Sequence, residues 1–260
     1  MENETIDENE VWEDLLDELF ALNYNQTDEI FNIQPRISQQ LQSAPDNISG
    51  LITLMYSEVM LGNRQSAIEL AEKIWEIGGD LDEFFEFVYV ENLLNLGLLD
   101  RASILLKPRF EDLRNSIDLF YPSLTKFAVM TGNISLISRI ADYAEFVEDE
   151  DADLFELANT YIETNNIPTF KNIMRLILEN SIDNLCSYEY TLYHDRGFPE
   201  IEITLYYNAD AALISQQEEN VNKKITALWN SQGLKPLDNI TVSILPITEH
   251  EGWDTEPTED

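Results

Sequence analysis

Residues that could carry out nucleophilic or acid–base chemistry are few in this chain of 260 residues. Histidine occurs twice, and His194 is followed by Asp195, a carboxylate that could orient its imidazole ring. An enzyme site here would use Tyr190, His194 or Cys186, which lie close together in the sequence. Adjacent residues in a predicted loop are usually solvated, however, and neither a G-x-S-x-G nor an H-E-x-x-H motif accompanies them. We therefore predict no catalytic residue.

Metal and phosphate chemistry is equally poorly supported. The acidic run at 148–153 places carboxylates at the first three ligand positions of an EF-hand loop, but Leu154 stands where that loop needs glycine and Thr160 where it needs glutamate. A single cysteine excludes both an internal disulfide and a cysteine-rich zinc site. None of the nine glycines belongs to a phosphate-binding loop motif. We expect no metal and no cofactor.

Charge restricts the class of partner. The chain has 50 Asp and Glu residues against 15 Lys and Arg residues, a formal net charge of −35. Nucleic acid backbones and anionic lipids would repel it, so no direct contact with either is expected. Residues 1–30 hold eleven acids and residues 249–260 hold six, with no base in either stretch. This distribution favours a basic partner, and the absence of a signal peptide or a bilayer-length apolar run predicts a cytoplasmic protein.

A repeat positions most of the apolar residues. Gly62, Gly97 and Gly132 stand 35 residues apart, each between two apolar runs with helical periodicity. Asparagines at 165–166 mark the turn of a fourth copy, and Asn25 marks that of a poorer copy at the start. The pattern predicts about five helical hairpins.

Several residues at fixed offsets from these turns carry a family resemblance. Alanines follow the first two glycines by five residues, at Ala67 and Ala102, and leucines precede three of the turns by eight residues. The chain resembles the tetratricopeptide repeat family over roughly residues 11–180. The resemblance implies a right-handed superhelix whose first helices line a concave groove for a partner's helix or extended peptide. Mapped onto this chain, the groove residues are Tyr56, Met60, Phe84, Phe87, Glu91, Asn95, Lys126, Met130, Phe155, Asn159 and Glu163.

The apolar pattern changes near residue 185 from helical to alternating. Two alternating stretches, a helix over about 210–229 and a third alternating stretch at 240–245 predict the order β-β-α-β. The fold class is thus mainly α, with a small α+β segment at the end. We divide the chain into an acidic tail (1–10), the helical repeats (11–183), the α+β segment (184–248) and a second acidic tail (249–260). An exposed edge of the small sheet is a candidate surface for homodimer formation.

These observations favour a non-catalytic protein–protein interaction scaffold or adaptor that binds a basic or amphipathic protein or peptide. Two alternatives stay open at this point. One is an acidic mimic of nucleic acid that inhibits a DNA- or RNA-binding protein, motivated by the net charge. The other is an enzyme with its site in the C-terminal α+β segment.

Overall fold

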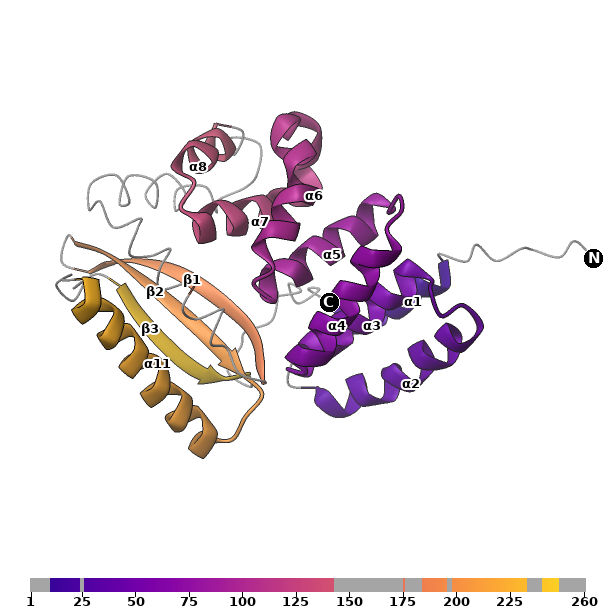
Figure 1. The fold of residues 1–260 in the computed structure, drawn as a ribbon, viewed down its shortest axis with the longest axis horizontal. Coiled ribbons are helices and arrows are strands. Elements are labelled where there is room, and N and C mark those ends of the chain that lie inside the picture. The colour runs from indigo at the N-terminus through magenta and orange to yellow at the C-terminus, as the bar shows by residue number, and fades with distance from the viewer. Residues whose placement is uncertain are drawn as a thin grey trace, which may run out of the picture.

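The computed structural model describes residues 10–23, 26–142, 175, 184–195, 198–232 and 240–247. These residues are mainly helical and include a small three-stranded mixed sheet near the C-terminus (Figure 1). The predicted change from helices to β-β-α-β is therefore confirmed. Before the sheet, the described helices are α1 (Glu10–Phe20), α2 (Thr27–Ser43), α3 (Ile48–Met60), α4 (Arg64–Ile77), α5 (Glu83–Asn95), α6 (Leu99–Glu111), α7 (Leu113–Thr131) and α8 (Ile134–Ala141).

The predicted turn glycines separate α3 from α4, α5 from α6 and α7 from α8. Gly62, Gly97 and Gly132 have φ values of 73°, 71° and 57°, in the left-handed region that favours glycine. In each turn, the amide after the glycine donates a hydrogen bond to the carbonyl five residues earlier. These bonds satisfy carbonyl groups that the end of a helix leaves without partners. The 35-residue spacing thus reports one turn geometry used three times.

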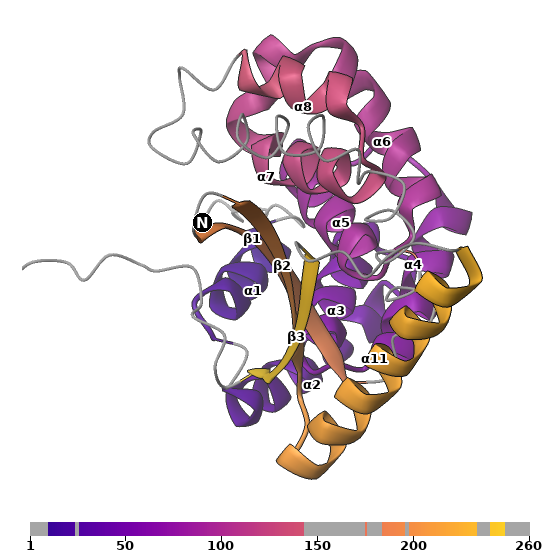
Figure 2. The same cartoon turned by 90° about the vertical axis from the view of Figure 1, so that its left-hand side faces the viewer.

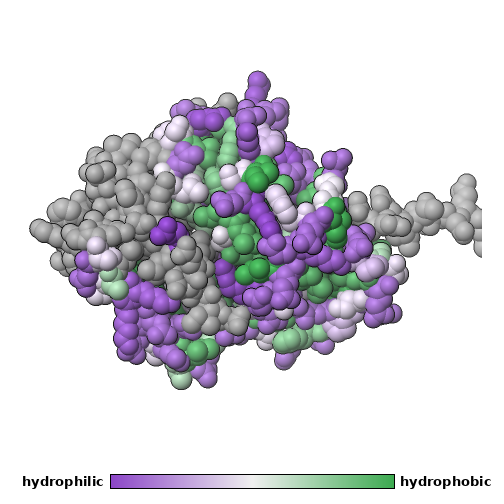
Figure 3. Space-filling model, viewed as in Figure 1, coloured by the Kyte–Doolittle hydropathy of each residue, from purple (hydrophilic) through white to green (hydrophobic). Residues whose placement is uncertain are grey.

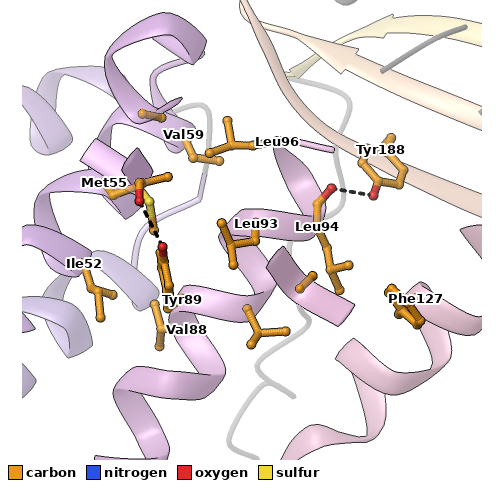
Figure 4. Close-up of a cluster of buried hydrophobic side chains, with 14 of the residues drawn as sticks. Ile52, Met55, Val59, Val88, Tyr89, Leu93, Leu94, Leu96, Phe127 and Tyr188 are labelled. Atoms are coloured by element: carbon orange, nitrogen blue, oxygen red, sulfur yellow. Dashed lines mark hydrogen bonds between the residues drawn. The ribbon is translucent and has the colours of Figure 1, made fainter. Parts of the chain in front are cut away.

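The helices pack as consecutive pairs whose first members also touch. Helix α3 packs against α4 and also against α1 and α5, while α5 packs against α6 and α7. Met55, Val88 and Tyr89 lie together in the apolar core between these helices (Figure 4). The buried Tyr89 hydroxyl donates to the carbonyl oxygen of Ala71, 3.0 Å away, which satisfies the one polar group that this ring brings into the core.

Several arginine side chains form hydrogen bonds or ion pairs between neighbouring helices. Arg64 is 8% exposed, and its guanidinium donates to the carbonyl oxygen of Leu96 at 2.6 Å. It therefore caps the end of α5 from the start of α4. Arg109 on α6 bonds Glu83 at 2.6 Å and Glu86 at 2.9 Å, both on α5. Cations that link neighbouring helices in this way are not available to neutralise the surplus carboxylates on the surface.

The sheet consists of β1 (Leu185–Asp195), β2 (Phe198–Tyr207) and β3 (Ile240–Pro246), with α11 (Ala211–Gln232) between the last two. Strand β1 pairs antiparallel with β2, and β2 pairs parallel with β3. Helix α11 runs alongside the sheet next to β3 (Figure 2). Within the described residues, no strand pairs with the other side of β3. The homodimer through a sheet edge stays a prediction.

The strands are longer than the alternating pattern indicated. His194, predicted in a loop, lies in β1 opposite Pro199 of β2, because the two strands stay paired as far as Asp195 and Phe198. Ile203, Leu205 and Ile244 belong to the main core together with Ile225 of α11. The helix therefore supplies part of the apolar cover that a three-stranded sheet needs to be stable.

Candidate protein-binding surface

The predicted groove residues lie on the first helices of the hairpins. Helix α3 carries Tyr56 and Met60, and helix α7 carries Lys126 and Met130. Helix α5 carries the four others in the described part: Phe84, Phe87, Glu91 and Asn95. Phe155, Asn159 and Glu163 fall outside the described residues. The others divide into residues near the chain's own sheet, a residue packed between α5 and α7, and residues that stay partly exposed at the surface.

The sheet packs against the C-terminal ends of α3, α5 and α7. Tyr188 of β1 is 3% exposed, and its hydroxyl lies 2.9 Å from the carbonyl oxygen of Leu94 and 2.7 Å from the sulfur of Met130 (Figure 4). At the start of β1, the Asn184 amide donates to the carbonyl oxygen of Gly62 at 2.8 Å. Met60 and Met130 are both buried. This end of the predicted groove is therefore closed to a partner by the protein itself.

The polar groove residues join helices to one another. The Lys126 ammonium donates to the Asn95 side-chain oxygen and lies 4.0 Å from the nearer carboxylate oxygen of Glu91. The same ammonium stands 4.6 Å from the centre of the Tyr188 ring, within range of a cation–π interaction. Ser123 of α7 donates to the other carboxylate oxygen of Glu91. Lys126, Glu91 and Asn95 therefore hold α5, α7 and β1 together.

Helices α1, α3 and α5 together carry a set of aromatic rings that we call the aromatic patch: Phe20, Tyr56 and Phe84. Phe20 is the last residue of α1, and its ring packs edge-to-face against Tyr56 of α3 at 5.0 Å and Phe84 of α5 at 6.0 Å between ring centres. Phe20 is 41% exposed, and Tyr56 and Phe84 are half-buried. Three helices distant in sequence thus converge on one partly exposed apolar surface.

Phe87 does not extend this patch as an open binding residue. Its ring packs against Phe120 of α7, with ring centres 6.0 Å apart and nearly perpendicular. The Arg109 guanidinium lies 4.4 Å from the centre of the Phe120 ring. Burial disfavours the charge on Arg109, but its bonds to Glu86 and Glu83 outweigh that effect and raise the pKa of the guanidinium. Phe87 is therefore part of the contact between α5 and α7.

Other exposed apolar residues differ from Phe20 in their surroundings. On the face shown in Figure 3, apolar side chains gather in the middle, over the helices, and hydrophilic side chains surround them. Phe31 of α2 and Ile104 of α6 are 55% and 59% exposed. Single exposed apolar side chains are ordinary on protein surfaces. What marks Phe20 is its contact with two further aromatic rings on other helices, a feature that the repeat pattern did not reveal.

The three candidate catalytic residues all lie on β1, and the structure describes the side chain of Cys186. Cys186 is 2% exposed, and burial raises the pKa of its thiol to about 12, so the nucleophilic thiolate is scarce at neutral pH. Tyr190 and His194 lie on β1, but their side chains are outside the described part. Within the part of the chain that is described, no three His, Cys, Asp or Glu side chains cluster as metal ligands. Helices long and apolar enough to cross a membrane are likewise absent from the described ranges.

Comparison with known proteins adds no family assignment. No family model, no curated protein and no solved structure matches this chain.

Proposed function

We propose that this protein is a non-catalytic interaction scaffold or adaptor that binds a partner protein through the aromatic patch. In this proposal, the helical hairpins form a right-handed superhelix of the tetratricopeptide repeat kind. The support is the equal spacing of three identical turns and the packing of each first helix against the next. The protein would act in the cytoplasm, where its single thiol needs no disulfide partner.

The observation that carries the proposal is the exposure of Phe20 within the aromatic patch. The exposed apolar area of a surface phenylalanine is in contact with water, and moving that area out of water into an interface is favourable in free energy. Covering the exposed 41% of this residue would contribute roughly 2 kcal/mol at about 25 cal/mol per Å² of apolar area. The rings of Tyr56 and Phe84 hold Phe20 in place, so little side-chain entropy is lost on binding.

A matched pair of variants tests this function. Phe20→Ala removes the exposed ring of the aromatic patch, and Phe31→Ala removes a more exposed phenylalanine from the neighbouring helix α2. Each full-length protein is immobilised and exposed to cell lysate at low and at high salt, and retained proteins are identified by mass spectrometry. We expect a partner protein that stays bound at high salt to the Phe31→Ala variant but not to the Phe20→Ala variant. Both variants should have the circular dichroism spectrum of the unmodified protein, which shows that they are folded. Equal retention by both variants would contradict binding at the patch.

A further inference from the structure

From the charges around the aromatic patch, we infer that its occupant is a cationic amphipathic helix of the partner protein, with an apolar anchor against Phe20 and Lys or Arg side chains against α1. This inference rests on the proposed function and names the chemistry of the partner. It begins from α1, the helix that supplies Phe20 and that contains five acids and no base.

One face of α1 combines carboxylates with the exposed ring. Glu13, Asp17 and Phe20 are spaced i, i+4 and i+7, so they share one face of the helix. All three side chains are exposed, whereas Trp12, Leu15, Leu16 and Leu19 bury the opposite face in the core. The acidic residues and the aromatic anchor therefore form one continuous surface.

The cations of the helical part do not neutralise this surface. Residues 10–142 contain 22 acids and 9 bases, a net charge of −13. Arg36, the cation that contacts α1, bonds Glu18 through both of its terminal nitrogens, at 2.7 Å for one of them. Arg109 is similarly committed to Glu83 and Glu86 beside Phe84. Six of the 22 carboxylates pair with cations among the described residues, which leaves 16 without an ion pair there, Glu13 and Asp17 included.

The occupant follows from this combination. An apolar partner segment would leave Glu13 and Asp17 facing apolar atoms at the edge of the interface, and an acidic one would be repelled. A cationic segment satisfies both the rings and the carboxylates. Along α1, Asp17 lies about 4.5 Å and Glu13 about 10.5 Å from Phe20, at about 1.5 Å per residue. In a partner helix these distances correspond to cations about three and seven residues beyond the anchor, two positions that share one face of that helix.

The test uses three fluorescein-labelled helical peptides and the full-length protein. The first carries an anchor of three leucines followed by lysines three and seven residues after the last leucine. The second replaces those lysines by glutamate, and the third replaces the leucines by alanine. Fluorescence anisotropy at about 50 mM and 300 mM salt gives the affinities. We expect the first peptide to bind at least about ten-fold more tightly than either other peptide, with a preference that shrinks as salt rises.

Two single-charge variants locate the effect on the protein. Glu13→Gln should weaken the lysine peptide by about two- to five-fold, whereas Glu76→Gln, which removes an exposed carboxylate from α4, should leave it unchanged. Equal weakening by both would show attraction to net charge alone and would overturn the inference. Equal affinity for the lysine and glutamate peptides, or no binding of either, would also overturn it. The proposed function would survive those results if Phe20→Ala still lost a lysate partner.

Discussion

Replacement of Gly62 by alanine should weaken the contact between the turn after α3 and the residue that precedes the sheet, Asn184. Gly62 has a φ of 73°, and a methyl group added there would lie 2.8 Å from the Cα atom of Asn184, closer than real Cβ contacts come. Asn184 cannot shift freely, because its amide donates to the Gly62 carbonyl and its own carbonyl accepts from the Asn208 amide, both at 2.8 Å. The substitution thus strains a turn and pushes away the residue that precedes β1.

The magnitude follows from two contributions. Alanine in a left-handed conformation costs about 1–2 kcal/mol relative to glycine. Loss of the two hydrogen bonds of Asn184 adds roughly 1–3 kcal/mol at about 0.5–1.5 kcal/mol for each bond. We therefore expect Gly62→Ala to lower the free energy of unfolding by about 2–5 kcal/mol.

Gly78→Ala is a control that places alanine at a positive φ without a close contact. Gly78 has φ 61° and ψ 179°, a conformation that is essentially restricted to glycine, but an added methyl group would meet no atom within 4 Å. Urea unfolding followed by circular dichroism gives the stability of each variant, and hydrogen exchange reports the amides of Asn184 and Asn208. Gly62→Ala should lose more stability than the control and should expose both amides. Equal losses, with these amides still protected, would refute the contact between the turn and the sheet.

The remaining predictions concern buried polar groups. Tyr188→Phe should cost about 1 kcal/mol in urea unfolding, because it removes the hydroxyl contact with the Leu94 carbonyl; no measurable loss would contradict that contact. Arg64→Met should cost about 1.5–3 kcal/mol, because it removes a charged cap from the end of α5, and a neutral result in thermal unfolding would argue against the cap. Burial raises the pKa of Tyr89 from 10.0 to about 12, so its contribution to stability is complete below pH 10 and is lost as the pH rises towards 12; Tyr89→Phe should flatten stability over that range. The Cys186 thiol, with its pKa also raised to about 12 by burial, should react with iodoacetamide far more slowly in the folded protein than in urea.

Local patterns in the sequence predicted the elements well. The 35-residue spacing of Gly62, Gly97 and Gly132 located three helical hairpins, because a helix that ends in a left-handed turn needs glycine at that point. Alternation of apolar residues located the three strands, since successive side chains of a strand point to opposite faces. Both patterns depend on residues that are close together in the sequence, so they can be recognised without knowledge of the tertiary structure.

Contacts between distant segments were not visible in those patterns. Lys126 and Met130 were predicted to line a partner-binding groove. In the structure both contact Tyr188, which lies far along the chain on β1. Phe20 was not among the predicted site residues, since nothing in the α1 sequence shows that its ring meets Tyr56 and Phe84. From sequence alone, an apolar residue on a helix is expected to lie in the core, and only the packing of the neighbouring helices shows whether it is exposed.

Binding of a partner protein at the aromatic patch is tested most directly by a photo-crosslinker placed in the patch. The photoreactive amino acid p-benzoylphenylalanine would replace Phe20 in one protein and Phe31 of α2 in another, each produced at full length in cells. After irradiation, purified adducts would be identified by mass spectrometry. We expect a defined protein adduct from position 20 that position 31 does not form. Adducts at neither position, or the same adducts at both, would contradict it.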